Sequence, residues 1–437
     1  MTSFYNEVII HNCNENSISD VFSNMRGEYT MKEQTKDRRL ILFGTLLAQF
    51  GLGTIYTWSL FNQHLATAFG WNLQSVTVTF SITSFALAFA TLFAGKLQDK
   101  IGIRKLITIC GIVFGIGLIL TSFISTLPML YLTAGVIVGV ADGIAYISTL
   151  SNCIKWFPEN KGVISGISVG AYGMGSLIFR FVDGSLLSHF GVSKTFFDWG
   201  ILGMIFIVLG AQFLADAPFI SSVSKSGTIQ KEFSLTEMLK TKEFYFFFII
   251  FFSACMSGLY LIGVVKDIGV QLAGLTPLAA ANAVAMVAVF NTIGRLILGA
   301  LSDKLGRLNI LIFTMAVTLL SVFTLSFFTL TFTNFFLCVA SIAFCFGGNI
   351  TVFPTIIGDF FGINNQTKNY GLVYQGFGLG ALGGSFVAAL AGSFKATFII
   401  VAALCILSIC LIVTIKISEK RHHNAFSHSS AYAQGSI

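Results

Sequence analysis

The sequence has little charge and very little proline. Only 10% of its 437 residues are Asp, Glu, Lys or Arg, and five are proline, so long helices can run without interruption. Hydrophobic residues make up 55% of the chain, and 46 residues are Phe. This composition, with a mean hydropathy of +0.82, excludes a soluble domain of this length.

Cysteine and histidine form no motif for a metal or for redox chemistry. The eight cysteines include no C-x-x-C pair, and six lie inside apolar runs, so we interpret them as reduced packing residues. None of the six histidines lies in the interior of such a run, and the carboxylates within the runs are isolated. A membrane-embedded enzyme needs clustered ligands or carboxylates. We therefore expect no enzyme activity, no metal and no cofactor.

About twelve apolar runs are long enough to cross a bilayer as helices, which takes roughly 20 residues each. Their approximate bounds are 40–62, 73–94, 106–126, 129–150, 162–182, 196–215, 244–265, 278–300, 309–331, 334–356, 370–391 and 396–416. Barrel strands are shorter and alternate in polarity, whereas these runs are continuously apolar. The predicted fold class is an all-α polytopic membrane protein.

The positions of Lys and Arg predict the orientation in the membrane. If both termini are cytoplasmic, the tails and inward connectors hold 21 of the 26 basic residues, leaving Arg180, Lys194, Lys266, Arg295 and Lys395. This is the positive-inside pattern. We expect a bacterial inner (cytoplasmic) membrane protein with both termini cytoplasmic. Since topology explains the net charge of +7, the lipid bilayer is the partner it indicates, and no nucleic acid is expected.

The chain contains an internal duplication with an offset of 204 residues. This shift carries Asp99 to Asp303, Gly143 to Gly347, and the pair at 156–157 to the pair at 360–361. Two bundles facing each other across a central site are the expected result. We expect a polar N-terminal extension (1–38), a six-helix bundle (39–215), a central cytoplasmic loop (216–243), a second six-helix bundle (244–416) and a cytoplasmic tail (417–437).

The N-terminal 30 residues lack the basic and then apolar layout of a signal peptide, and Met31 offers an alternative start. Three glycine series repeat every four residues, within 135–143, 162–170 and 376–384. Such series let helices approach closely, either for static packing or as a sliding seam between the bundles.

Two copies of a charged loop follow the second and eighth runs. GKLQDKIGIRK occupies 95–105, and GALSDKLGRLN occupies 299–309. A carboxylate flanked by cations can pair with a neighbouring helix terminus or Arg and hold one end closed; the alternative is a solvated turn. The expected gating residues are Gly95, Asp99, Lys100, Arg104, Gly299, Asp303, Lys304 and Arg307.

The two loop copies resemble the loop signature of the major facilitator superfamily, and the resemblance covers essentially all of 38–416. Within it, four stretches resemble the oxalate/formate antiporter family and, taken together, its pyruvate-transporter branch: QFGLGTIYTWSLF, SNCIKWFPENKG, MSGLYLIGVVKDIG and NNQTKNYGLVYQGFG. The resemblance implies a major facilitator fold, with about 12 transmembrane helices in two pseudo-symmetric six-helix bundles, and alternating-access transport of a small organic anion.

Ionisable residues inside apolar runs are functional candidates because a buried charge there costs at least about 2.5 kcal/mol unless it meets water or a partner. Asp142 lies near the middle of the fourth run. It is the candidate for proton coupling, and the alternative is a permanent ion pair or hydrogen bond, for example with Tyr146 one helical turn away.

Arg295 lies about one turn inside the cytoplasmic end of the eighth run. In the resembled family, an Arg at this position and a Lys on helix 11 are understood to bind the substrate carboxylates, a task that suits the planar guanidinium. This sequence has no cation in the eleventh run; the lysine would fall near Phe377, and Lys368 lies before the run. One cation should favour a monocarboxylate over a small dicarboxylate such as oxalate. The alternative is an Arg that snorkels to the interface or braces the Asp303 loop.

Arg180 and Lys266 are candidates for a second cation, although each has a carboxylate within reach, Asp183 and Asp267, and a local ion pair is the alternative. Aromatic residues with polar tips are expected to shape the pocket. The candidates are Tyr56, Trp58, Tyr146, Tyr260 and Tyr374, with Asn291 and Gln375 as weaker ones.

The sequence therefore predicts a secondary transporter of a pyruvate-like monocarboxylate, coupled to a proton or to a counter-transported carboxylate. An oxalate/formate-type antiporter, a drug or sugar exporter of the same fold, and a metabolite receptor without transport are the alternatives. A membrane enzyme is disfavoured by the isolated carboxylates.

Overall fold

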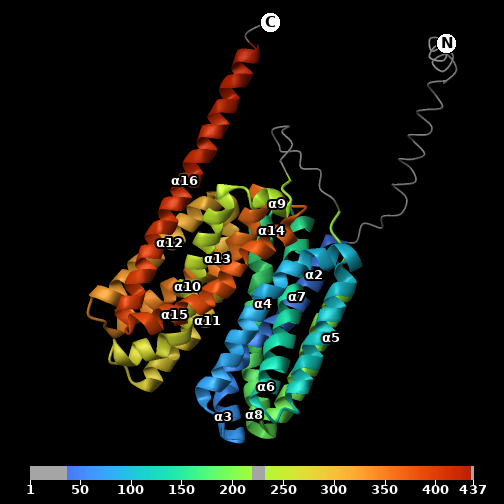
Figure 1. Ribbon diagram of the computed structural model, residues 1–437, viewed down its shortest axis with the longest axis vertical. Helices are drawn as coiled ribbons and strands as arrows, with labels where there is room; N and C mark the ends of the chain where they lie inside the picture. Colours follow the sequence, from blue (N-terminus) through green and yellow to red (C-terminus); the bar gives the residue numbers. More distant parts are fainter. Residues whose placement is uncertain (1–36, 219–231, 435–437) are drawn as a thin grey trace, which may run out of the picture.

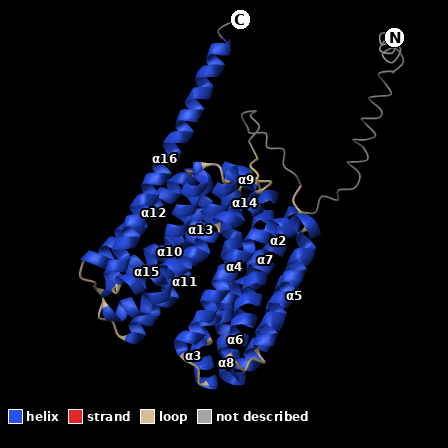
Figure 2. Ribbon diagram, viewed as in Figure 1, coloured by secondary structure: helices blue, strands red, loops and turns tan. Residues whose placement is uncertain are grey.

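The computed structural model describes residues 37–218 and 232–434, which form helices and loops without strands (Figure 2). Most of the expected N-terminal extension and part of the expected central loop lie outside these ranges. The helices in chain order are α2 (Arg38–Gly53), η1 (Thr54–Leu60), α3 (Asn62–Phe69), α4 (Leu73–Ile101), α5 (Ile103–Thr121), α6 (Leu127–Leu130), η2 (Tyr131–Ile137), α7 (Val138–Trp156), α8 (Lys161–Phe213), α9 (Leu235–Met238), α10 (Lys242–Gln271), α11 (Pro277–Leu305), α12 (Arg307–Phe327), α13 (Phe332–Phe361), α14 (Gln366–Val373), α15 (Gln375–Ala391) and α16 (Phe394–Gln434).

Ten helices of the described ranges are long and apolar enough to cross a membrane, against about twelve expected runs. The difference has two local causes. The 53-residue α8 contains the fifth and sixth runs, which meet at Gly191, where φ is 76° and the helix is interrupted. The eleventh run is divided between α14 and α15 at Tyr374, and α15 has only 17 residues. Counted as crossings, the described helices account for all twelve runs.

The duplication is visible in the helix bounds. α4 and α11 both have 29 residues, and Leu73 plus 204 gives Pro277. Each helix begins with a side-chain cap, from Asn72 and Thr276 respectively, which satisfies a free N–H of the first turn. Each ends before a glycine with positive φ, Gly102 (77°) and Gly306 (86°). Equivalent turn chemistry therefore starts and stops equivalent helices in the two halves.

The two halves lie side by side, the N-terminal half in blue to green and the C-terminal half in yellow to red (Figure 1). They meet near α9 and α14 and diverge towards the end that carries α3 and α6 (Figure 1). Across the interface, α4 packs against α14 and α15, and α8 packs against α11 and α13. We call the end at which the halves meet the closed end. It contains the ends of α4 and α11 and the beginning of α8.

The glycine series serve different interfaces. Gly162 and Gly166 of α8 approach backbone oxygens of Gly299 and Arg295 in α11, so this series lies in the seam between the halves. The series within 135–143 faces α4, and the series within 376–384 faces α10, each within its own half. The expectation of a sliding seam therefore fits only the series on α8, and the other two series pack helices of one half.

The first crossing is not a continuous α-helix. It changes to the 3₁₀ segment η1 over Thr54–Leu60 before α3 begins. Where α2 changes to η1, α2 and α8 approach closely at Gly53 and Gly175. A Cβ atom at either position would overlap the backbone of the other helix. The tight packing fixes where the side chains of η1 lie relative to α8.

Candidate functional site

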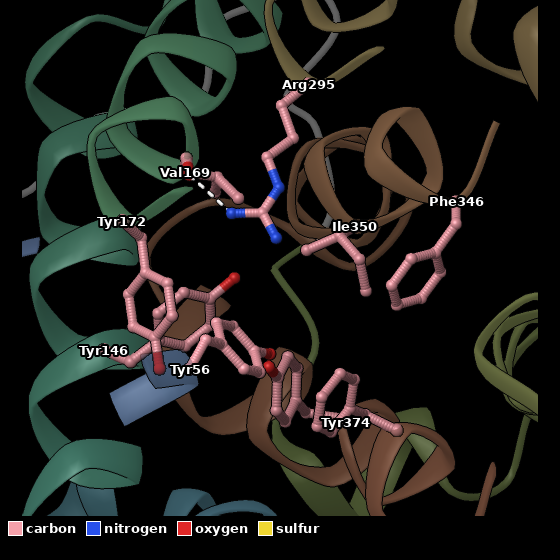
Figure 3. A pocket seen from close by; sticks show the side chains of 9 residues that line it. Tyr56, Tyr146, Val169, Tyr172, Arg295, Phe346, Ile350 and Tyr374 are labelled. Carbon is pink, nitrogen blue, oxygen red and sulfur yellow. Dashed lines mark hydrogen bonds between the residues drawn. The ribbon is translucent and has the colours of Figure 1, made fainter. Parts of the chain in front are cut away.

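A small pocket lies between the halves, on the inner side of the closed end. The N-terminal half contributes Tyr56 of η1, Tyr146 of α7, and Val169 and Tyr172 of α8 (Figure 3). The C-terminal half contributes Arg295 of α11, Phe346 and Ile350 of α13, Tyr374 at the α14–α15 break, and Phe377 of α15. Both halves therefore contribute to it. Four of the sequence candidates, Arg295, Tyr56, Tyr146 and Tyr374, meet here.

Arg295 supplies the charge of the pocket. Its side chain is only 5% exposed, and its Nη1 donates a 2.8 Å hydrogen bond to the Val169 carbonyl oxygen across the interface (Figure 3). Its Nε has no hydrogen-bond partner, and among the described residues no carboxylate lies within 4.0 Å of the guanidinium. The helix continues ten residues beyond Arg295, from 295 to 305. The prediction that Arg295 lies one turn from the cytoplasmic end of its helix was wrong, because α11 continues past the expected end at residue 300. Arg295 therefore lies about 15 Å along the helix from that end.

Four tyrosine rings surround the space in front of the guanidinium (Figure 3). Ring centroids are 5.5 Å apart for Tyr56 and Tyr172, 5.2 Å for Tyr146 and Tyr172, and 5.6 Å for Tyr146 and Tyr374. The contacts form a chain from the N-terminal half to the C-terminal half. Tyrosine offers an apolar ring and a hydroxyl that donates or accepts hydrogen bonds, so the wall excludes water and can still bind an oxygen atom.

The remaining wall is apolar. Phe377 is 3% exposed and stacks on Tyr374 with centroids 5.1 Å apart, and Phe346 and Ile350 line the pocket beside it. This places Phe377, the position near which the resembled family's lysine would fall, inside the same pocket as Arg295. Lys368 does not reach the pocket; it forms an ion pair with Asp99 at the closed end.

Asp142 lies behind the tyrosine wall and does not line the pocket. The carboxyl is fully buried, and its Oδ2 accepts a 3.0 Å hydrogen bond from the Tyr172 hydroxyl. Its Oδ1 has no hydrogen-bond partner within residues 37–218 and 232–434. The alternative expectation of a hydrogen bond named Tyr146 on the same helix as an example, but the packing of α7 against α8 brings Tyr172 to Asp142 instead. Asp142 is thus connected to the pocket through one side chain of the wall.

Four further candidates are not brought into the pocket. Trp58 is buried in the N-terminal half against Phe196 (centroids 5.8 Å apart), and Tyr260 packs against Phe398 (5.8 Å). Arg180 is exposed on α8. It forms no ion pair with Asp183, which is buried. Lys266 lies in α10, and its side chain is outside the described part of the chain.

The weaker candidates Asn291 and Gln375 both bind backbone oxygens, of Ala343 (3.3 Å) and Ala88 (2.6 Å). Their amide groups therefore help to hold helices together, Asn291 within the C-terminal half and Gln375 across the interface. Neither lines the pocket.

The second copy of the charged loop joins the halves at the closed end. The two carboxylate oxygens of Asp303 accept hydrogen bonds from the backbone N–H groups of Gly162 and Val163, each 2.9 Å long. These N–H groups belong to the first turn of α8, whose own N-cap residue makes no side-chain bond. Arg307 binds the same carboxylate at 3.0 Å and also pairs with Asp359, to which Lys161 of the other half donates at 2.7 Å. Gly299 permits this contact, since a Cβ there would meet Thr351 and Gly162.

The first copy of the charged loop makes fewer contacts with the other half. Asp99 pairs with Lys368 across the interface, and Gly95 lies directly beside the Lys368 backbone. Arg104 donates to the Gln212 carbonyl within its own half. Lys100 and Lys304 lie exposed in the last turns of α4 and α11. Equivalent sequences thus make unequal contacts: a capped helix in one copy and a partly exposed ion pair in the other.

Tyr172, Val169, Phe346, Ile350 and Phe377 line the pocket and were not predicted as site residues. Two signals were available. Tyr172 is a polar-tipped residue between Gly170 and Gly173, like the tyrosines that were selected. Phe346 is the duplicate of Asp142, since 142 plus 204 is 346. No local sequence signal distinguishes Val169 or Ile350 from other apolar residues.

Comparisons with known proteins agree with this fold. The sequence profile of the Major Facilitator Superfamily matches residues 41–355. The chain is 44% identical over 353 residues to YhjX of Escherichia coli K12, an uncharacterized MFS-type transporter, covering 81% of this chain and 88% of YhjX. It is 28% identical to the oxalate:formate antiporter of Oxalobacter formigenes (81% and 85% covered) and 23% identical to apicoplast pyruvate carrier 1 of Toxoplasma gondii (77% and 80%). The crystal structure of the MFS transporter FucP in the outward conformation superposes with a TM-score of 0.66 at 15% identity, covering 85% of this chain and 98% of FucP.

Proposed function

Because the chain belongs to the major facilitator superfamily, we propose that it carries small monocarboxylates such as pyruvate across the cytoplasmic membrane, coupled to protons, by alternating access. It is a multi-pass membrane protein with a transporter fold, and not an enzyme. The substrate, the proton coupling and the membrane orientation are the content of the proposal.

The observation that carries the proposal is the unpaired charge of Arg295. A guanidinium that is 5% exposed and that, within the described ranges, is bound only to a carbonyl oxygen leaves donors free in a buried site. Burying such a charge is costly unless an anion joins it, and a carboxylate matches the planar fork of donors. The tyrosine hydroxyls beside it offer further hydrogen bonds to a substrate oxygen.

The pocket favours one negative charge over two. Arg295 is the single cation among the described residues that line the pocket, and the lining includes Phe377 and Phe346, which offer no partner to a second anionic group. A second carboxylate there would lose its hydration without gaining a partner, whereas a methyl group would lie against apolar rings. Similarity to the oxalate:formate antiporter and to the apicoplast pyruvate carrier supports a carboxylate substrate, and the apolar wall favours the monocarboxylate.

Transport would proceed by rocking of the two halves about the pocket. We assign the closed end to the cytoplasm from the positive-inside pattern. The Asp303 cap and the Asp99–Lys368 pair would hold this end shut and separate when it opens. Asp142 would bind the coupled proton. Because Tyr172 donates a hydrogen bond to Asp142 and lines the pocket, a change in the protonation of Asp142 would change the hydrogen bonding of a pocket residue.

Counterflow in proteoliposomes tests the function directly. Vesicles loaded with pyruvate should accumulate labelled pyruvate, and other short monocarboxylates should compete better than oxalate. Preferred exchange of oxalate would indicate the antiporter alternative, labelled sugar or drug movement would indicate an exporter, and binding without flux would indicate a receptor.

The charge of Arg295 is tested by substitution. Arg295→Gln should weaken pyruvate binding by about 2 kcal/mol or more, roughly 30-fold, because a buried charged partner is lost. Arg295→Lys should retain part of the affinity. The matched control is Arg180→Gln, which removes an exposed arginine and should leave affinity unchanged. Full affinity in Arg295→Gln would contradict the proposed site.

A further inference from the structure

A second buried carboxyl group lies in the same half as Asp142. Asp183 of α8 has no exposed surface and is not part of the pocket. It follows Tyr172 by eleven residues, which is close to three full helical turns, so both side chains project from one face of α8 about 16 Å apart. Asp183 therefore lies between the pocket and the end opposite the closed end.

The contacts around Asp183 fit a protonated carboxyl group. The Thr57 hydroxyl lies 2.8 Å from Asp183 Oδ2 and 2.9 Å from the Thr54 carbonyl oxygen. One hydroxyl has one proton to donate, and an ionised carboxylate only accepts. Both short contacts are satisfied at once when Thr57 donates to the carbonyl oxygen and a protonated carboxyl donates to Thr57 Oγ1.

Neighbouring groups supply no other hydrogen-bond donor for the Asp183 carboxyl group. The Thr54 hydroxyl donates to the Gly51 carbonyl oxygen at 2.8 Å and accepts from Trp199 Nε1 at 2.8 Å, which fixes the beginning of η1. Asp183 Oδ1 has no hydrogen-bond partner in the part of the chain that the structure describes. A charged carboxylate that is fully buried with one bare oxygen would be strongly destabilised, whereas a neutral carboxyl is tolerated.

No cation compensates the group among the described residues. On its own helix, Arg180 is exposed; on η1, Thr57 faces the carboxyl and Tyr56 faces the pocket. The other charged groups on α8 and on the elements packed against it are bound elsewhere, exposed, or at the closed end: Arg38, Arg39, Arg104, Lys105, Asp142, Lys155, Lys161, His189, Lys194, Asp198, Arg295, Asp303, Lys304 and Asp359.

From this geometry we propose that Asp183 is a second proton-binding site, occupied in the present state, which releases its proton when η1 moves. In the release step the carboxyl O–H bond breaks, water at the end opposite the closed end takes the proton, and the carboxylate becomes hydrated. The proposal rests on the proposed transport function for its role, and on the Asp183–Thr57 contact for its chemistry.

The 3₁₀ segment η1 connects this site to the pocket. Thr57 and Tyr56 are adjacent, and the Tyr56 ring contacts Tyr172, whose hydroxyl binds Asp142. A substrate that displaces Tyr56 therefore displaces Thr57, and with it the acceptor of the Asp183 proton. The two carboxyl groups are coupled through one short segment that departs from α-helical geometry.

Infrared spectroscopy of the full-length protein in liposomes tests the protonation without transport. At neutral pH, exposed carboxylates are ionised, so a carboxylic C=O stretching band reports a buried protonated group. Because Asp142 is a second buried carboxyl group that can give such a band, the comparison is made in an Asp142→Asn background. In this background we expect a band that is lost when Asp183→Asn is added, and that shifts when Thr57→Val is added, since Thr57→Val removes the hydroxyl from the carboxyl. A band that survives in the Asp142→Asn/Asp183→Asn double variant, or one insensitive to Thr57→Val, would overturn the proposal.

Transport measurements test the role. Asp183→Asn imitates a permanently protonated carboxyl, since its amide can donate to Thr57 Oγ1. Pyruvate counterflow should continue in this variant, whereas uptake driven by a pH gradient should fall to the level of protein-free liposomes. Gradient-driven uptake with an unchanged pH dependence would refute the role. If the wild-type protein moves no monocarboxylate, the proposed function fails, and the infrared result still decides the protonation of Asp183.

Discussion

The two copies of the charged loop make a quantitative prediction about the closed end. Replacing Asp303 with Ala removes the acceptor of the Gly162 and Val163 N–H groups and one partner of Arg307. The two backbone contacts cross the interface and exist only while the halves meet at this end, whereas the Asp303–Arg307 pair lies within the C-terminal half. In the opposite conformation the same groups would be hydrated, so the substitution should selectively destabilise the state seen here.

The free energy lost in Asp303→Ala can be estimated from the contacts that the substitution removes. An N-cap is worth about 0.5–2 kcal/mol, and a carboxylate at a helix N-terminus adds about 0.3–1 kcal/mol, more when partly buried. The side chains of Asp303 and Arg307 are 16% and 13% exposed, so water screens the contacts only in part. A net loss of about 2 kcal/mol is expected, which changes the ratio of the two conformations about 30-fold.

Distances between spin labels across the closed end measure this ratio. Lys105 and Lys240 are exposed at the closed end, one on each half, and can be replaced with labelled cysteines after Cys13 and Cys410 are changed to Ser. Pulsed electron paramagnetic resonance then reports the short and long distances of the two states. Asp303→Ala should enlarge the long-distance population, and Asp303→Asn should have a smaller effect because one acceptor oxygen remains.

The first loop copy supplies the matched control. Asp99 is 62% exposed and its partner Lys368 33% exposed, so this pair should contribute about 0–1 kcal/mol, at most roughly fivefold. An equal effect of Asp99→Ala and Asp303→Ala, or no change in the distances of Asp303→Ala, would refute the argument that the helix cap holds the closed end.

Three further predictions concern one residue that lines the pocket and two that lie outside it. Phe377→Lys should let oxalate compete with pyruvate in counterflow by supplying a second cation, whereas Phe377→Leu should not. Asp142→Asn should abolish accumulation of pyruvate against its gradient while counterflow continues; accumulation with an unchanged pH dependence would exclude Asp142 from coupling. Trp58→Phe should leave pyruvate affinity unchanged, since Trp58 packs against Phe196 outside the pocket; a large loss of affinity would show that the described state does not represent the substrate complex.

Much of the fold is determined by local sequence properties. Runs of about 20 apolar residues must satisfy their backbone hydrogen bonds internally in lipid, so they form helices wherever they stand in the chain. The 204-residue offset reappears in the bounds of α4 and α11 and in the glycines at 102 and 306, because caps and positive-φ turns depend on single residues. The burial of a charge at Arg295 could also be predicted, since this residue lies within an apolar run.

The contacts between helices could not be predicted from the sequence. Tyr172 rather than Tyr146 binds Asp142, Thr57 rather than Arg180 faces Asp183, and Asp303 caps a helix of the other half while its duplicate Asp99 does not. Such pairings depend on how helices far apart in the chain are rotated and displaced relative to one another, which the periodicity of one helix does not contain. Composition and repetition thus determined the helices and the presence of a buried charge, and the packing of the two halves decided which groups surround it.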